Sequence, residues 1–437
     1  MEKVALSLGN SYSSIQGLTS DHHKRLSGIM SYVVDTGGYG GFQRRQKLLS
    51  KTGEFGTGLL YLVSDYLTKH QIPFKITDPR IAPISQFKLF NLKLPHNPYP
   101  EQIASVEAAR RLKRGIISAV TGSGKSLMMA LLINRLQLKV LIVVPTLELK
   151  KQLREDFTQW FGSLDNITIE NIASPKLEVK GDYNLLLIDE AHHAASKTYR
   201  TLNKKVWNSI YYKFFYTATA YRSNSEEQLL MESVTGQVIF SLDYKTAVAK
   251  GYVCPIDAYY FIIPTKTEVE GFTWAQVYRE LVTENRSRNL IITDLLESLD
   301  HAGESTLCLV KEVQHGRDLV AKCDFAQFVC GVDDESKVHI KDFNKGKIKS
   351  LIGTTGVLSE GIDTKACSYV VIAGLGKSKN AFVQMCGRAI RKYPGKESAK
   401  VIIFLDKSHK FTKSHFAAQK KILRDEFGVV PVLLTLE

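Results

Sequence analysis

The feature that most constrains the fold is a glycine-rich loop, TGSGKS at residues 121–126, between the apolar run GIISAV and a helix-like segment. Glycines let backbone N–H groups approach a phosphate chain closely, and the start of a helix favours negative charge. In such a loop Lys125 binds the β and γ phosphates, and the Ser126 hydroxyl binds Mg²⁺. The alternative is a plain glycine-rich turn. The pattern favours a nucleoside triphosphate site formed by Ala119, Val120, Thr121, Gly122, Ser123, Gly124, Lys125 and Ser126.

A second apolar run ends abruptly in charge, LLLIDEAHH at residues 185–193. A short apolar run of this kind predicts a strand buried on both faces of a parallel sheet, with its polar residues at the carboxyl edge where ligands bind. There Asp189 would hold Mg²⁺, and Glu190 would orient and deprotonate the water that attacks the γ-phosphate. A solvated strand end and a metal site on His192 and His193 are the alternatives. The metal site is disfavoured because adjacent imidazoles point in different directions.

Apolar runs and helix-patterned segments alternate twice along the chain, which predicts two α/β units with parallel sheets. The first 85 residues form a different pattern, with SYVVD and FKITD flanking a helix-like stretch. We therefore expect an α/β protein with a small, separate N-terminal accessory domain at 1–85. The two parallel-sheet domains are expected at 86–245 and 246–405, followed by a helical tail at 406–437.

Composition narrows the class of protein further. The 437 residues are 44% hydrophobic and 23% charged, the balance of a globular protein, and carry a formal net charge of +14. Basic surfaces attract polyanions, so nucleic acid is the expected partner. We see neither a membrane-length apolar run nor a signal peptide, and the six cysteines show no C-x-x-C pair. The expectation is a monomer without membrane contact, in the cytoplasm, or in the host cytoplasm if a phage encodes it.

The N-terminal module has its own basic segment. Residues 1–100 hold twelve Lys and Arg against six Asp and Glu, and a glycine-rich loop at 36–42 precedes Arg44, Arg45, Lys47 and Lys51. These four side chains could follow a phosphate backbone while Tyr39 and Phe42 stack on bases. The alternative is a glycine loop before a solvated helix face. In the tail we expect a helix over 413–427 that serves packing first.

Several motifs together resemble superfamily 2 helicases, in order, from about residue 95 to 405. Residues 189–192 read DEAH, the form of the helicase box in this family, and the sequence at 217–219 reads TAT. The resemblance implies adenine contact by Tyr99 and Gln102, nucleotide contact by Gly361 and Asp363, and catalysis by Lys125, Asp189, Glu190, Gln384, Arg388 and Arg391. It implies nucleic-acid contact by Pro145, Thr146, Gln152, Arg222, Thr354 and Thr355, and coupling by His192, Thr217, Ala218 and Thr219.

This family has two tandem RecA-like domains, and its members use ATP with Mg²⁺. Arg388 and Arg391 are three residues apart, so they would share one helix face and could reach the γ-phosphate held by the first unit. The DEAH form and Gln384 are more similar to DNA translocases, including restriction motors, the RecG group and UvsW-type phage branch-migration helicases. The implied function is ATP-driven 3′→5′ unwinding or branch migration of branched, forked or duplex DNA in phage-type replication, recombination or repair. Alternatives are a duplex translocase of a restriction or remodelling complex, an RNA helicase, and a nucleotide-gated clamp.

Overall fold

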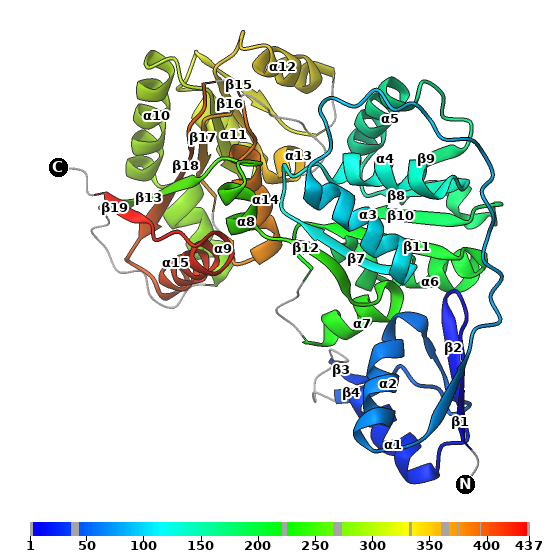
Figure 1. Cartoon of the computed structure of the whole chain (residues 1–437). Coiled ribbons are helices and arrows are strands. Elements are labelled where there is room, and N and C mark those ends of the chain that lie inside the picture. The colour runs from blue at the N-terminus through cyan, green and yellow to red at the C-terminus, as the bar shows by residue number, and fades with distance from the viewer. Residues whose placement is uncertain are drawn as a thin grey trace. The chain divides into compact units, whose positions relative to one another are not determined.

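The computed structural model describes residues 3–35, 43–220, 225–264, 273–331, 334–359, 367–374, 376–393 and 395–434 (Figure 1). By their internal contacts these residues form two compact units. One comprises residues 1–119 and 124–241, and the other comprises residues 120–123 and 242–437. No helix among the described residues combines the length and the apolar character needed to cross a membrane.

The first unit contains a six-stranded sheet in the order β12-β7-β11-β10-β8-β9, with parallel pairing from β7 through β9. We call residues 100–242 the first sheet domain. Its strands are β7 (Arg114–Ala119), β8 (Val140–Val144), β9 (Ile167–Asn171), β10 (Leu185–Asp189), β11 (Tyr212–Thr217) and β12 (Val238–Leu242). Its helices are α3 (Pro100–Leu112), α4 (Lys125–Leu136), α5 (Leu147–Phe161), α6 (Lys197–Lys205) and α7 (Ser225–Thr235).

Strand β10 explains the LLLID run. It lies between β8 and β11, and the side chains from Leu185 to Ile188 are fully buried. A central parallel strand is covered on both faces, so it needs a continuous apolar sequence rather than an alternating one. The charged residues begin where the strand ends, at Asp189.

The second unit is built on a seven-stranded sheet in the order β15-β16-β14-β17-β18-β13-β19, parallel at every pair. Its strands are β13 (Ile256–Ile263), β14 (Thr306–Val310), β15 (Ala326–Val329), β16 (Ser350–Thr354), β17 (Tyr369–Ile372), β18 (Ala399–Asp406) and β19 (Val432–Leu434). The helices are α8 (Tyr244–Ala249), α9 (Trp274–Tyr278), α10 (Arg286–His301), α11 (Val313–Val320), α12 (Asp334–Asn344), α13 (Thr355–Ser359), α14 (Lys379–Ala389) and α15 (Lys410–Ile422). The two RecA-like domains expected from the sequence are thus confirmed.

The tail is more than a helix. Helix α15 continues into a π-helical turn at Leu423–Phe427, and together the two segments span the predicted helix at 413–427. After this turn the chain returns to the sheet. Strand β19 pairs with β13 in parallel, with Val432 opposite Tyr259. The tail therefore completes the edge of the second sheet.

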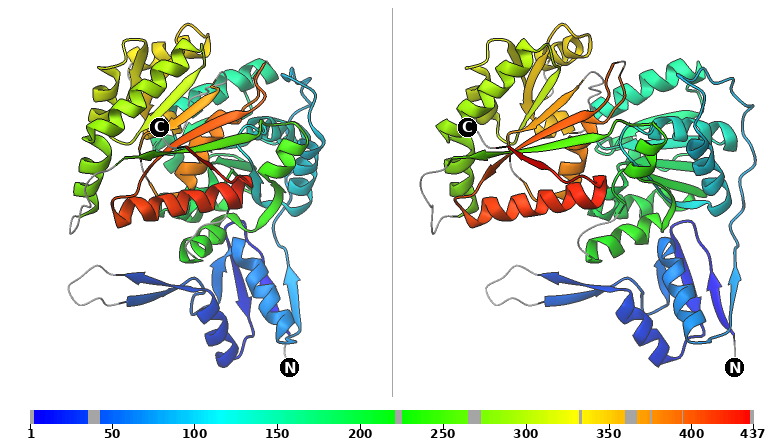
Figure 2. Two further views of the ribbon diagram at one scale, coloured as in Figure 1. Left: turned by 90° about the vertical axis from the view of Figure 1, so that its left-hand side faces the viewer. Right: turned by 60° about the vertical axis from the view of Figure 1, so that its left-hand side comes forward.

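A small sheet domain precedes the first sheet domain. It has the order β5-β2-β1-β6, formed by β1 (Val4–Ser7), β2 (Tyr12–Gln16), β5 (Glu54–Gly56) and β6 (Phe74–Thr77). Helices α1 (Ser20–Ile29) and α2 (Leu60–Lys69) contribute Leu26, Val63 and Leu67 to its core. A separate two-stranded hairpin of β3 (Ser31–Asp35) and β4 (Gln43–Lys47) projects from it (Figure 2).

Buried polar groups join this N-terminal domain to the first sheet domain. Lys213 on β11 is fully buried, and its Nζ donates to Ser11 Oγ at 2.6 Å and to Asn203 Oδ1 at 3.0 Å. Arg114 at the start of β7 donates to the carbonyls of Asn10 and Val234. A polar group buried without partners is costly, so these bonds tie the two domains into one unit. The N-terminal domain has its own core, but it is not isolated from its neighbour.

Candidate nucleotide and nucleic-acid site

Three functional segments end at the same edge of the first sheet. Strand register pairs Ser118 on β7 with Thr217 on β11, and Tyr216 on β11 with Asp189 on β10. Because the strands are parallel, the loop after β7, the acidic end of β10 and the threonines after β11 all leave the sheet together. This is the carboxyl edge, where open α/β sheets bind ligands.

The glycine-rich loop takes the backbone conformation that its sequence requires. Gly122 and Gly124 have φ angles of +84° and +85°, a left-handed region that other residues enter only with strain. Gly124 caps α4, so Lys125 is the first helical residue, and its Nζ donates to the carbonyl of Ala119 at 3.4 Å. Ser126 follows on the same first turn. A helix start with a lysine folded over the loop is suited to a phosphate chain.

Glu190 holds an unusual conformation at the end of β10. Its φ of 52° and ψ of 58° are left-handed, and its amide donates to Asp189 Oδ1 at 3.0 Å. A non-glycine residue in this region stores strain, which is often retained at functional sites.

The surroundings of Glu190 keep its carboxyl ionised. Burial raises the pKa of its carboxyl, but His192, Lys125 and His193 together outweigh burial and lower the pKa to about 2. The buried His192 places its Nδ1 at 3.3 Å from Glu190 Oε2, and its ring packs against that of His193 at 4.2 Å. Glu190 is therefore ionised at neutral pH. Within the described part of the chain, no group of three or more His, Cys, Asp and Glu residues could hold a metal.

The TAT segment closes on itself after β11. Thr217 is fully buried, and its Oγ1 accepts the amide of Thr219 at 3.1 Å. This local bond fixes the exit of β11 beside the acidic end of β10. Ala218 lies between the two threonines, and Arg222 lies outside the described residues.

Gln102, predicted to contact adenine, also caps helix α3. It is fully buried in the first turn of α3, and its Oε1 accepts the backbone N–H of Tyr99 at 2.8 Å. This completes a capping box at the start of the helix. A Cβ added to Gly124 would approach Gln102 Nε2 to 2.5 Å, so the amide lies against the glycine-rich loop.

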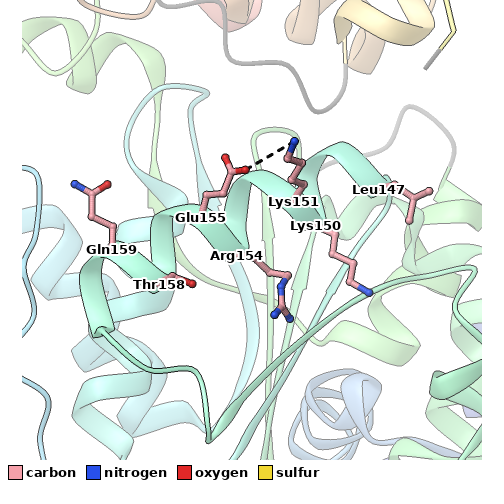
Figure 3. Close-up of a pocket in the computed structure, with 7 residues that line it drawn as sticks. All are labelled: Leu147, Lys150, Lys151, Arg154, Glu155, Thr158 and Gln159. Atoms are coloured by element: carbon pink, nitrogen blue, oxygen red, sulfur yellow. Dashed lines mark ion pairs between the residues drawn. The ribbon is translucent and has the colours of Figure 1, made fainter. Parts of the chain in front are cut away.

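Helix α5 carries the segment predicted to touch a nucleic-acid backbone. The Thr146 hydroxyl caps it by accepting the amide of Leu149 at 3.2 Å, Asn171 Nδ2 donates to the carbonyl of Pro145 at 2.7 Å, and Gln152 is half-buried. A surface cavity along the helix is lined by Leu147, Lys150, Lys151, Arg154, Glu155, Thr158 and Gln159 (Figure 3).

The cavity is also lined by basic residues that were not among the contacts predicted from the sequence. Lys150 pairs with Glu170 at 2.6 Å, Lys151 pairs loosely with Glu155 at 3.9 Å, and Arg154 is exposed one turn further along. Arg154 was missed because it lies past the recognisable motif. The i, i+3 spacing between Lys151 and Arg154 was the signal that could have found it.

The described site residues predicted in the second unit lie at the end of β16 and on or just after α14. Thr354 ends β16 and Thr355 begins α13, whereas Gly361 and Asp363 lie outside the described residues. Gln384 and the buried Arg388 lie on α14, but the helix ends at Ala389, so Arg391 lies beyond it. The expectation that both arginines share one helix face is therefore wrong.

The basic N-terminal segment is a strand, not a helix face. Arg44, Arg45 and Lys47 lie on β4, and Lys51 follows in an exposed turn. Arg45 and Lys47 are exposed and two residues apart, so they occupy the same face of the hairpin. Tyr39 and Phe42 lie outside the described residues.

Two parallel-sheet domains in tandem, one with a phosphate-binding loop beside an acidic strand end, define a P-loop nucleoside triphosphatase of the helicase type. Two family models match the chain: "Type III restriction enzyme, res subunit" at residues 95–180 and "Helicase conserved C-terminal domain" at residues 280–393. The chain is similar to superfamily 2 helicases, with a UvsW-like relationship, and these likenesses support an ATP-dependent helicase.

Among curated proteins, the ATP-dependent DNA helicase UvsW of Enterobacteria phage T4 is 26% identical over 348 residues, covering 71% of this chain and 68% of the relative. The DNA 3′-5′ translocase XPB2 of Sulfurisphaera tokodaii is 22% identical, covering 67% and 78%. Among solved structures, the DNA-bound restriction-modification enzyme LlaBIII has a TM-score of 0.57 at 14% identity, covering 79% of this chain and 32% of that chain. Saccharomyces cerevisiae Dbp5 bound to RNA has a TM-score of 0.53 at 16% identity, covering 78% and 94%. The structural likenesses establish the fold.

Proposed function

We propose that this helicase is a DNA motor that couples ATP hydrolysis to unwinding or branch migration of branched DNA, with 3′→5′ polarity. The observation that carries the motor is the shared edge of β7, β10 and β11, which brings Lys125, Glu190 and Thr217 to one place. DNA rather than RNA is favoured because the matched relatives UvsW and XPB2 are named for DNA.

In the proposed reaction the glycine-rich loop binds the phosphates of ATP and Lys125 neutralises them. Glu190, which is ionised, accepts a proton from the attacking water. The donor set fits Mg²⁺, because the Ser126 hydroxyl and the Asp189 carboxylate are hard oxygen ligands at one sheet edge. Bound Mg²⁺ would neutralise charge developing on the phosphates.

The second unit would supply positive charge to the same reaction. Arg388 and Arg391 stabilise charge on the γ-phosphate in this proposal, while Gln384, Gly361 and Asp363 contact nucleotide or water. Such arginines typically account for 10³-fold or more in turnover. Gln102 and Tyr99 would recognise adenine.

The proposed DNA path uses both sheet domains and the N-terminal hairpin. Pro145, Thr146, Gln152, Arg222, Thr354 and Thr355 would contact one strand. Arg44, Arg45, Lys47 and Lys51 would hold a second duplex arm, because Arg45 and Lys47 are exposed on a projecting hairpin. Coupling between strand and nucleotide would pass through His192 and the segment 217–219.

The deciding experiment measures ATP hydrolysis with single-stranded, duplex, forked and four-way DNA, and with RNA. We expect the strongest stimulation by forked and four-way DNA, and none of the activity in Lys125→Ala. Glu190→Gln should bind ATP but not hydrolyse it, since it removes only the proton acceptor. Equal stimulation by RNA would contradict the DNA assignment.

A second candidate is a translocase that moves along duplex DNA without separating strands. The match of residues 95–180 to a restriction-enzyme subunit favours it. Displacement of a third strand from plain duplex, without unwinding of a fork, would identify this activity. Fork unwinding with little triplex displacement supports the first proposal.

A further inference from the structure

The C-terminal end of α14 lacks the usual glycine cap. The last carbonyls of a helix have no partner within the helix, and a left-handed glycine after the end commonly satisfies them. Here Ile390 follows Ala389 with φ of −76°, so the backbone does not turn to cap itself. The carbonyls at and just after this helix end are those of Ala389, Ile390 and Arg391.

The side chain of Lys396 donates hydrogen bonds to two of these carbonyls. Its Nζ donates to the carbonyls of Ala389 and Cys367, and to that of Arg391 at 3.3 Å. An ammonium has three N–H donors, and all three meet backbone oxygen. The negative end of the helix dipole lies at the same place and favours the cation.

Cys254 completes the arrangement. Its amide donates to the carbonyl of Ile390 at 2.8 Å, and its thiol lies 3.8 Å from the Arg391 oxygen. Cys254 precedes β13 and Cys367 precedes β17, so both bonds lead back to the sheet. The carbonyls of three successive residues, 389 to 391, are thus fastened to the core of the second unit.

We propose that Lys396 is a positioning residue that sets the place of Arg391 for ATP hydrolysis. The inference rests on the proposed role of Arg391 in turnover. Lys396 bonds the main chain of Ala389 and Arg391 and ties both to the Cys367 carbonyl, and Arg391 lies beyond the end of α14. Shifts of about 1 Å in a catalytic group can cost on the order of a hundredfold in rate. The ammonium is therefore expected to affect kcat rather than nucleotide affinity.

The test compares Lys396→Met with Lys392→Met, an exposed lysine of the same segment, in DNA-stimulated ATP hydrolysis of the full chain. Lys396→Met should lower kcat by roughly tenfold to a hundredfold, with KM for ATP within about twofold of wild type. Lys392→Met should keep both constants. Lys396→Arg keeps a cation but presents a planar head, so it should lose only a few-fold in kcat.

A double-mutant cycle separates positioning from general destabilisation. Arg391→Ala should depress kcat strongly, and Lys396→Met should add almost nothing in that background. An equal loss from Lys396→Met in both backgrounds would overturn the inference, as would unchanged kcat. If Arg391→Ala itself leaves kcat unchanged, the proposed role of Arg391 fails instead. Should Lys396→Met not fold, wild-type kcat in Lys396→Arg would overturn the inference.

Discussion

The side-chain Nζ of Lys213, in the first sheet domain, donates a 2.6 Å hydrogen bond to the hydroxyl of Ser11 in the N-terminal domain. Ser11 Oγ in turn donates to Asn203 Oδ1 at 3.1 Å, and both residues are buried. Four residues after Lys213, the same strand reaches Thr217 and the nucleotide edge. A contact with the N-terminal domain and the predicted coupling segment thus share one strand.

The pH dependence of stability should report this lysine. Burial, with Arg114 and Arg80 nearby, lowers the pKa of Lys213 well below its ordinary 10.5. Between the folded and unfolded pKa values the unfolded chain binds more protons, so the free energy of unfolding rises with pH in that range. Urea unfolding from pH 7 to 10 should show this rise in the wild type. Lys213→Met should flatten it, and the exposed Lys205→Met should not; identical slopes in all three would contradict the assignment.

Removal of the N-terminal domain should harm the first sheet domain. Deleting residues 1–77 takes away Asn10 and Ser11, which leaves Arg114 and Lys213 without these partners. A hydrogen bond to a charged group typically contributes about 1.5–3 kcal/mol to stability. We expect a lower midpoint of thermal unfolding for residues 78–242 than for residues 1–242. A midpoint unchanged by the deletion would show that the junction adds no stability.

Gln102 can be tested for its two tasks separately. Gln102→Glu keeps the oxygen that accepts the Tyr99 amide but replaces the N–H donors that would read adenine. Because Gln102 is fully buried, the carboxyl also costs some thermal stability, and we expect a reduced preference for ATP over GTP. Gln102→Ala removes the cap as well and should cost about 1 kcal/mol in addition. The ratio of kcat/KM for the two nucleotides is the measurement; an unchanged ratio in Gln102→Glu would rule out adenine reading.

The effect of His192 on ATP hydrolysis should be largest at low pH. His192 is the strongest influence lowering the Glu190 pKa, which is about 2 in the wild type. His192→Ala should raise that pKa, so the carboxylate is protonated, and hydrolysis lost, at a higher pH as the solution is acidified. At pH 8 Glu190 remains ionised in both proteins. We therefore expect the acid limb of the DNA-independent ATPase profile to lie at a higher pH in the variant than in wild type; identical acid limbs would speak against this coupling.

The basic hairpin is expected to contact DNA. Replacing Arg45 and Lys47 with glutamine should weaken binding to forked duplex and reduce the log–log salt slope by about 0.9 per lost phosphate contact. The matched control replaces Lys69 and Lys75, which are exposed on α2 and β6 of the same domain. Fluorescence anisotropy at several salt concentrations measures both. Equal slopes for the two double variants would exclude a specific contact by the hairpin.

The site was easiest to predict from the sequence where reactive or phosphate-binding residues directly follow a strand. Gly124, Lys125 and Asp189 are tied to strand ends by short local patterns, so their shared edge could be predicted from the order of strands. The left-handed turn at Glu190 could not, because no glycine marks it. The end of α14 before Arg391 was missed for a similar reason: a lysine five residues later, not a local cap, satisfies the helix end.

The N-terminal junction was hidden because its members are far apart in sequence. Ser11, Asn203 and Lys213 each read as ordinary polar residues, and only the fold brings them together. Lysine is rarely fully buried, so composition gave no reason to expect it inside. The basic segment was recognised by its charge, but alternation over five residues was too short to distinguish a hairpin strand from a helix.

The buried lysine also limits how such proteins can be recombined. A chimera that grafts another N-terminal domain onto this motor must bring acceptors for Lys213 and Arg114, or change both residues with the graft. Linker length and surface charge would be secondary in that design. An exchange of the N-terminal domain therefore has to include residues of β7 and β11, inside the motor. A cut in the extended connection after residue 77 would leave these residues unmatched.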